Sequence, residues 1–216
     1  MVLPGALRAG LGLVAGVAAL VVGVLGGMYA GHGRPGRVDA WVQPAVEGAG
    51  PTPRHFALAL DFLGEPLGSV LLVGAVVAGC LLLWGPRAAV FVVACVGVAV
   101  GVATVLKYVV GRTIHGAGNL SYPSGHTAFL TALAFALALI VTGRLGLGGA
   151  AGTVLVLASA LVAGAAMGWA QVALGAHYPT DVVGGWCTAL AVVPATAWLV
   201  DRSAGRDARS RPAARR

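Results

Sequence analysis

The sequence predicts an all-α, polytopic membrane protein with six transmembrane helices in one bundle. Composition is the first observation: 58% of the 216 residues are hydrophobic and 10% are charged, and the mean hydropathy is +0.90. A soluble domain carries roughly 25% charged residues, so this balance excludes a soluble enzyme, a disordered chain and an ordinary DNA-binding domain. The second observation is that six apolar runs come close to or exceed the roughly 20 residues that cross a bilayer.

The predicted spans are residues 6–30, 67–84, 88–110, 125–141, 149–170 and 182–200. The first run could be read as a signal peptide, but it is long for one and lacks a clean cleavage site, which favours a span. The predicted division is then a first helix with a long extracytoplasmic loop (1–66), a five-helix core (67–200) and a basic tail (201–216).

The positive charges predict the orientation of the chain in the membrane. With both termini in the cytoplasm, the inner segments carry nine arginines, six of them in the tail, and the outer segments carry five cationic residues over a longer stretch. The polar loops after the third and fifth spans then lie together on the extracytoplasmic side. Because over half of the net charge of +7 sits in the tail, the charge does not indicate a nucleic-acid-binding face.

The first polar cluster lies at the outer end of the third span. Lys107 is in its last turn, and Gly111 allows a sharp turn, so that Arg112 can swing back beside Lys107. Basic residues at a helix end can equally extend to the membrane interface. If both face a pocket that water reaches, they form a cationic site that suits a phosphate.

The second cluster begins the fourth span. Ser124 is the predicted N-cap, with Gly125 and His126 in the first turn. A helix N-terminus has free backbone N–H groups and a partial positive charge, so it binds anions, and glycine lets an anion approach the backbone. The alternative is a plain helix start in which His126 is a polar interface residue.

The third cluster begins the sixth span. Pro179 fits the first helical position, which puts Asp181 near the third, where a carboxylate interacts favourably with the helix dipole. Asp181 follows His177 by four residues, so it can accept a hydrogen bond from the imidazole and raise the basicity of the distal nitrogen. A capping aspartate beside a surface histidine would give the same local pattern.

Together the three clusters provide what phosphoryl transfer through a histidine needs. One histidine attacks phosphorus, the other protonates the departing oxygen, and cations with backbone N–H groups stabilise the equatorial oxygens. This chemistry needs no metal or other cofactor, and the sequence shows no obvious acidic ligand cluster for a metal.

These motifs resemble those of the membrane branch of the type 2 phosphatidic acid phosphatases, which are related to the vanadium haloperoxidases. The resemblance covers about residues 88–200 and includes a complete Pro-Ser-Gly-His at 123–126, with Lys107, His177 and Asp181 also matching. It implies His177 as the nucleophile, Asp181 as its orienting partner and His126 as the general acid. It also implies that Lys107, Ser124 and the Gly125 N–H hold the phosphate.

The chain departs from the family pattern at two arginines. The family has Arg-Pro seven and eight residues after its lysine, where this chain has Ile114-His115, and it has an arginine where this chain has Gln171. Because both arginines bind phosphate in the family, we expect Arg112 to take over part of that role.

The sequence therefore predicts a multi-pass phosphatase of the cell membrane whose active site lies on the extracytoplasmic side. The expected substrate and partner is a polyprenyl or glycerolipid phosphate or diphosphate in the bilayer, and no nucleic acid or metal is expected. A single lysine against thirteen arginines suggests a GC-rich bacterial genome. The alternatives are a weak or inactive phosphatase-like protein that binds a lipid phosphate or a partner, and a small transporter. The specific lipid and the oligomeric state stay open.

Overall fold

The computed structural model describes residues 4–47 and 51–210, which are almost entirely helical. After a 3-10 turn (Gly5–Leu7), the elements are α1 (Arg8–Tyr29), α2 (Arg37–Glu47), α3 (Pro51–Gly64), α4 (Pro66–Leu83), α5 (Pro86–Val110), α6 (Gly125–Arg144), α7 (Gly149–Ala173) and α8 (Pro179–Ser210). Proline begins four of these helices, since its fixed φ and missing N–H suit the first helical position.

Six helices in the described residues are long and apolar enough to cross a membrane, which confirms the six predicted spans. They are Gly5–Tyr29, Pro66–Leu83, Pro86–Val110, Gly125–Arg144, Gly149–Ala173 and Pro179–Arg202. Each boundary lies within three residues of its predicted position. Several helices run slightly beyond the apolar run because backbone hydrogen bonding continues through the polar residues at the membrane interface.

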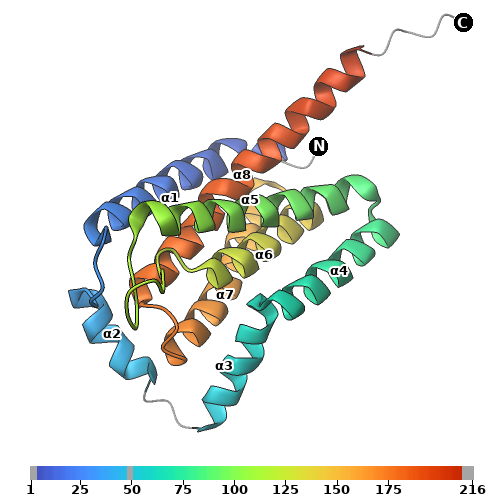
Figure 1. Ribbon diagram of the computed structural model, residues 1–216. Helices are drawn as coiled ribbons and strands as arrows, with labels where there is room; N and C mark the ends of the chain where they lie inside the picture. Colours follow the sequence, from blue (N-terminus) through green and yellow to red (C-terminus); the bar gives the residue numbers. More distant parts are fainter. Residues whose placement is uncertain (1–3, 48–50, 211–216) are drawn as a thin grey trace, which may run out of the picture.

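Helix α6 is the central helix and packs against α5, α7 and α8 (Figure 1). Its apolar segment is the most buried of the six spans. Glycines in α7 allow α8 to approach closely: a Cβ on Gly164 would lie 2.3 Å from Trp186 Cδ1, and one on Gly168 would lie 2.2 Å from Val182 Cγ1. Small residues at such contacts are typical of helix packing in lipid.

The long segment between the first two spans, which the sequence predicts as a loop, contains two helices. It folds into α2 and α3, which pack across the end of the bundle, α2 against α7 and α8, and α3 against α6 and α7 (Figure 1). These two helices are short, and the segment contains several prolines and glycines. No long apolar run therefore indicates them in the sequence. The two helices bring carboxylates to the end of the bundle that carries the predicted site.

The basic tail also begins as regular structure. Helix α8 continues beyond the membrane-spanning segment to Ser210, so the first part of the predicted tail (201–216) is helical. Three of its six arginines, Arg211, Arg215 and Arg216, lie outside the described residues.

The orientation predicts which exposed positions a membrane-impermeant thiol reagent reaches in intact cells. Asn119, in the α5–α6 loop, and Leu145, after α6, are both exposed and lie at opposite ends of the bundle. A cysteine at Asn119 should react in intact cells, and one at Leu145 only after permeabilisation. The native cysteines are all buried, so they should give little background. The reverse labelling pattern would overturn the predicted extracytoplasmic side.

Candidate active site

The predicted site residues lie where α5 ends and α6 and α8 begin (Figure 1). Ser124 is the N-cap of α6, as predicted, and its Oγ accepts a hydrogen bond from the Thr127 N–H at 3.3 Å. The Ser124 N–H donates to the Asp181 carbonyl oxygen at 2.9 Å, which ties the start of α6 to the first turn of α8. Gly185 makes this contact possible, because a Cβ there would lie 2.3 Å from the Ser124 carbonyl oxygen.

The first turn of α6 has an open side. A Cβ built on Gly125 would meet no atom within 4 Å. His126, in the same turn, is close enough to His177 and Lys107 to interact electrostatically with both. Lys107 is half-buried in the last turn of α5, and it has no hydrogen-bond or ion-pair partner among the described residues. This end of α6 therefore offers an anion both free N–H groups and one ammonium group.

His177 and Asp181 are neighbours, as their spacing predicts, but they are not hydrogen-bonded. The distance from His177 Nδ1 to Asp181 Oδ2 is 3.7 Å, with both side chains more than nine-tenths buried. Nδ1 has no hydrogen-bond partner. Asp181 Oδ2 instead accepts the N–H of Tyr178 at 3.1 Å. The carboxylate is thus fixed behind the imidazole, at a distance that a small ring movement would close.

Arg112 occupies a different environment from the open phosphate pocket predicted for it. Its side chain is fully buried, with Nη1 2.6 Å from Asp181 Oδ1 and Nη2 2.6 Å from Asp39 Oδ2. The guanidinium carbon lies 3.9 Å from the ring centroid of Tyr29 and 4.5 Å from that of Tyr178. Gly111 adopts the left-handed conformation that lets Arg112 turn inward. The expected turn therefore forms, but the charge of Arg112 is neutralised by two carboxylates.

Asp39 of α2 is a buried partner that sequence analysis did not identify. Its Oδ1 accepts the backbone N–H of Thr180 at 2.9 Å, in the first turn of α8, and its Oδ2 accepts the N–H of Gly36 at 2.9 Å. The Thr180 hydroxyl lies 2.8 Å from Asp39 Oδ1 and 2.7 Å from Arg112 Nη1. Asp39 thereby links α2 to the N-terminus of α8, where a carboxylate also suits the helix dipole.

A second pair of carboxylates faces His126. Nε2 of His126 is buried and has no hydrogen-bond partner, and it lies 3.6 Å from Asp61 Oδ1 and 3.7 Å from Glu65 Oε1. The end of α3 reaches the imidazole because Gly64 has no side chain: a Cβ there would lie 2.0 Å from His126 Cδ2. These three residues form a cluster with metal-ligand geometry, which the sequence did not reveal.

The two positions at which the family has arginines are occupied in other ways. Ile114 is buried, with 3% of its surface exposed. Gln171 is also buried, and its Nε2 donates to Asp61 Oδ1 at 2.7 Å. The ring of His115, which follows Ile114, is hydrogen-bonded through Nε2 to the Gly175 carbonyl oxygen at 2.7 Å. Neither position supplies the site with a fixed positive charge.

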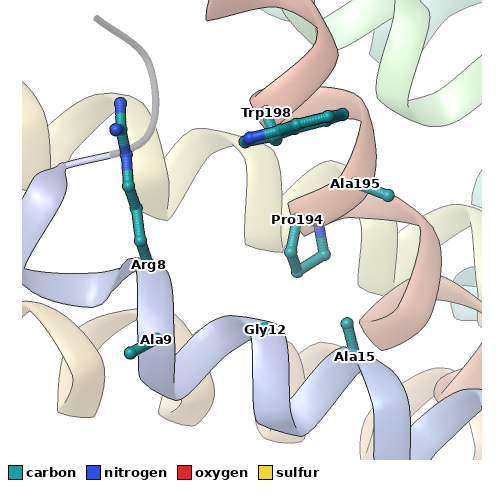
Figure 2. A pocket seen from close by; sticks show the side chains of 7 residues that line it. All are labelled: Arg8, Ala9, Gly12, Ala15, Pro194, Ala195 and Trp198. Atoms are coloured by element: carbon teal, nitrogen blue, oxygen red, sulfur yellow. The ribbon is translucent and has the colours of Figure 1, made fainter.

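Two apolar cavities lie along the helices. One, of about 680 Å³, runs between α4 and α5 and reaches Phe129, which follows His126 by three residues in α6. Gly97 and Gly101 of α5 lie on its wall. The other, of about 430 Å³, lies between α1 and α8 beside Arg8 and Trp198 (Figure 2). It is at the opposite end of α8 from the histidines, so it is separate from the site.

Comparisons with known proteins agree with this fold. The family model described as the PAP2 superfamily matches residues 88–204, which include both histidines. The fold is similar to the crystal structure of a transmembrane PAP2-type phosphatidylglycerolphosphate phosphatase from Bacillus subtilis, with a TM-score of 0.67 and 19% sequence identity over 92% of this chain and 98% of that chain. No curated protein matches the chain. Since the family model covers more than half of its residues, this six-helix membrane protein belongs to the PAP2 superfamily.

Proposed function

We propose that this chain is an integral membrane phosphatase that hydrolyses a lipid phosphate or diphosphate through a phosphohistidine intermediate, without a metal cofactor. The observation that carries the proposal is that His177 and Lys107 are close enough to His126 to interact with it electrostatically, beside the open first turn of α6. Asp181, 3.7 Å behind His177 Nδ1, completes the set. No other cluster among the described residues combines a nucleophile, a proton donor and an anion site.

In the first step, His177 Nε2 attacks phosphorus while the bond from phosphorus to the lipid oxygen breaks. His126 donates its proton to the departing oxygen, which belongs to the lipid alcohol when the substrate is a lipid phosphate and to the lipid monophosphate when it is a diphosphate. Asp181 stabilises the positive charge that develops on His177. We expect the 3.7 Å separation to shorten when substrate binds, because catalytic hydrogen bonds are often long without substrate.

The phosphoryl oxygens are held by groups at the helix ends. Lys107 supplies a full positive charge and the Gly125 N–H a backbone donor. The Ser124 Oγ accepts hydrogen bonds from the N–H and the hydroxyl of Thr127, at 3.3 and 3.0 Å, which leaves its own proton for a phosphate oxygen. All three groups approach from the end of the bundle that the α4–α5 cavity reaches.

The second step regenerates the enzyme. A water molecule attacks the phosphorus of phosphohistidine, and His126, now neutral, takes the proton from that water. The bond from phosphorus to Nε2 of His177 breaks, and inorganic phosphate leaves. Each histidine thus returns to its starting protonation state, and the balance needs no external oxidant, reductant or metal.

A lipid substrate is supported by the cavity between α4 and α5. Its wall is apolar and it extends from Ser69, near the start of α4, toward mid-membrane. Its nearest point in α6 is Phe129, one turn from His126. An acyl or polyprenyl chain in this cavity would keep its phosphate at the helix ends, so a polyprenyl or glycerolipid phosphate is the proposed substrate class. With both termini in the cytoplasm, the reaction takes place at the extracytoplasmic face of the cell membrane.

The second candidate function is binding: the protein would bind a lipid phosphate or a partner and hydrolyse it slowly or not at all. The buried Ile114 and the neutral Gln171 favour it, because each stands where the family has a phosphate-binding arginine. The retained pair of histidines favours hydrolysis, since binding alone needs neither a nucleophile nor an acid.

The roles of the two histidines should be distinguishable by how each alanine variant responds to the acidity of the leaving group. His177→Ala should abolish phosphate release, whereas His126→Ala should slow it by about 10²- to 10⁴-fold, and least for substrates with an acidic leaving group. Phosphate release from a lipid phosphate and from an aryl phosphate measures this, with EDTA present throughout. Full activity of His177→Ala would show that another group is the nucleophile.

Replacing Arg112 and replacing Lys107 should have different effects on stability. Removing one partner of a buried ion pair costs about 3–5 kcal/mol, so Arg112→Ala should lower the melting temperature and weaken activity through Asp181. Lys107→Ala should keep the melting temperature and lower kcat/KM. Thermal unfolding in detergent, run beside the phosphatase assay, compares the two. If both variants have the same melting temperature and lose the same activity, Arg112 binds the phosphate, as the sequence predicts, and does not act through Asp181.

A positive charge at position 171 should accelerate the reaction. Gln171→Arg keeps a donor for Asp61 and adds a charge-assisted hydrogen bond, worth about 1.5–3 kcal/mol, so kcat/KM should rise about tenfold or more. Gln171→Met, which has similar length and no donor, is the control and should not accelerate. If wild type and Gln171→Arg both release no phosphate, the second candidate function applies, in which the protein binds a lipid phosphate or a partner without hydrolysis.

A further inference from the structure

The cluster of His126 with Asp61 and Glu65 has the composition and spacing of a metal site. Asp61 lies in the last turn of α3, Glu65 is the N-cap of α4, and both lie near the same imidazole nitrogen. One ligand atom from each residue lies within 4.8 Å of the other two. Two atoms that each bind an ion at about 2.1 Å are separated by about 3.0–3.6 Å when the angle between them is 90–120°. The distances of 3.6 and 3.7 Å from Nε2 are therefore close to those of ligands that share one ion.

The buried Nε2 of His126 faces two carboxylate oxygens at 3.6 and 3.7 Å. Nε2 has no hydrogen-bond partner and is shielded from solvent. When Nε2 is unprotonated, its lone pair and two carboxylate oxygens face one another, which is unfavourable in a half-buried environment. Either a proton or a metal ion removes this repulsion.

The surroundings of the cluster favour an ion that enters from outside. Asp61 and Glu65 have no Lys or Arg partner among the described residues, and their side chains are 24% and 53% exposed. Gln171 donates to Asp61 Oδ1 at 2.7 Å, which orients that carboxylate without neutralising it. Such an outer hydrogen bond is typical of metal-binding carboxylates. An arginine at this position would instead place a competing positive charge beside the ion.

We propose that Asp61, Glu65 and His126 bind one divalent metal ion of the Zn²⁺ type. The imidazole ligand favours Zn²⁺ over Mg²⁺, Ca²⁺ and Mn²⁺, which prefer oxygen ligands. The consequence for catalysis rests on the proposed function: an ion on Nε2 replaces the proton that His126 donates to the leaving oxygen. The site is therefore inhibitory, and metal and proton compete for one nitrogen.

Binding is tested with the untagged full-length protein in detergent, by calorimetric titration with Zn²⁺. Wild type should bind one Zn²⁺ per chain, and Glu65→Gln should lose that binding. Because Glu65 is half-exposed, this change should not prevent folding, which a thermal melt checks. Glu47→Gln is the matched control, since Glu47 is an exposed carboxylate of α2 outside the cluster. Gln171→Ala should weaken binding by about 10- to 100-fold. Equal Zn²⁺ binding by wild type and Glu65→Gln would overturn the site.

Activity provides an independent measurement. Saturating Zn²⁺ should lower phosphate release by wild type and by Glu47→Gln about tenfold or more, since general acid catalysis contributes at least that much. EDTA should restore it, and Glu65→Gln should resist inhibition. Activation by Zn²⁺ bound at Glu65 would overturn the inhibitory role. Stoichiometric binding without hydrolysis of any lipid phosphate would refute the proposed function and leave the metal site standing.

Discussion

The ion pairs of Arg112 with Asp39 and Asp181 are the contact on which the rest of the active-site end depends. Three segments that are remote in the sequence, namely α2, the α5–α6 loop and the start of α8, meet at this one guanidinium. Burying a charge costs several kcal/mol unless it is well paired, and here two charge-assisted contacts of 2.6 Å and two aromatic rings surround it. This network fixes the position of Asp181, whose Oδ2 lies 3.7 Å from His177 Nδ1.

The same network determines how charge is distributed over the site. Because Arg112 is matched by two carboxylates, it contributes little positive potential to a phosphate at the first turn of α6. Among the described residues at this end of α6, Lys107 is the cation to which the proposed function assigns the phosphate, with helix N-terminal N–H groups beside it. On the other side of the site, Asp61 and Glu65 add negative charge next to His126. The site is thus polarised, with its cation on the phosphate side and its carboxylates on the side of the proton donor.

The parts of the structure that local pattern determines could be predicted, and those set by distant contacts could not. Apolar runs specify the spans, a serine before a turn specifies the cap of α6, and Pro179 specifies the start of α8. Asp39 and Asp61, in contrast, lie 73 and 110 residues from their partners Arg112 and Gln171. No local pattern marks such a pair. Arg112 combines both cases, because Gly111 predicted its inward turn and the folded chain decided what it meets.

The absence of the two family arginines and the two carboxylates beside His126 are best considered together. Partly exposed ion pairs contribute up to about 1 kcal/mol each, less than the about 1.5–3 kcal/mol of a charge-assisted hydrogen bond to phosphate. Asp61 and Glu65 place negative charge beside His126, the proposed proton donor. These carboxylates act on the proton donor and not on the phosphoryl oxygens, so they do not replace the two arginines that bind phosphate in the family. Gln171 donates to Asp61 Oδ1 at 2.7 Å and holds that carboxylate beside His126, so position 171 serves the leaving-group side of the proposed site where the family has a phosphate-binding arginine.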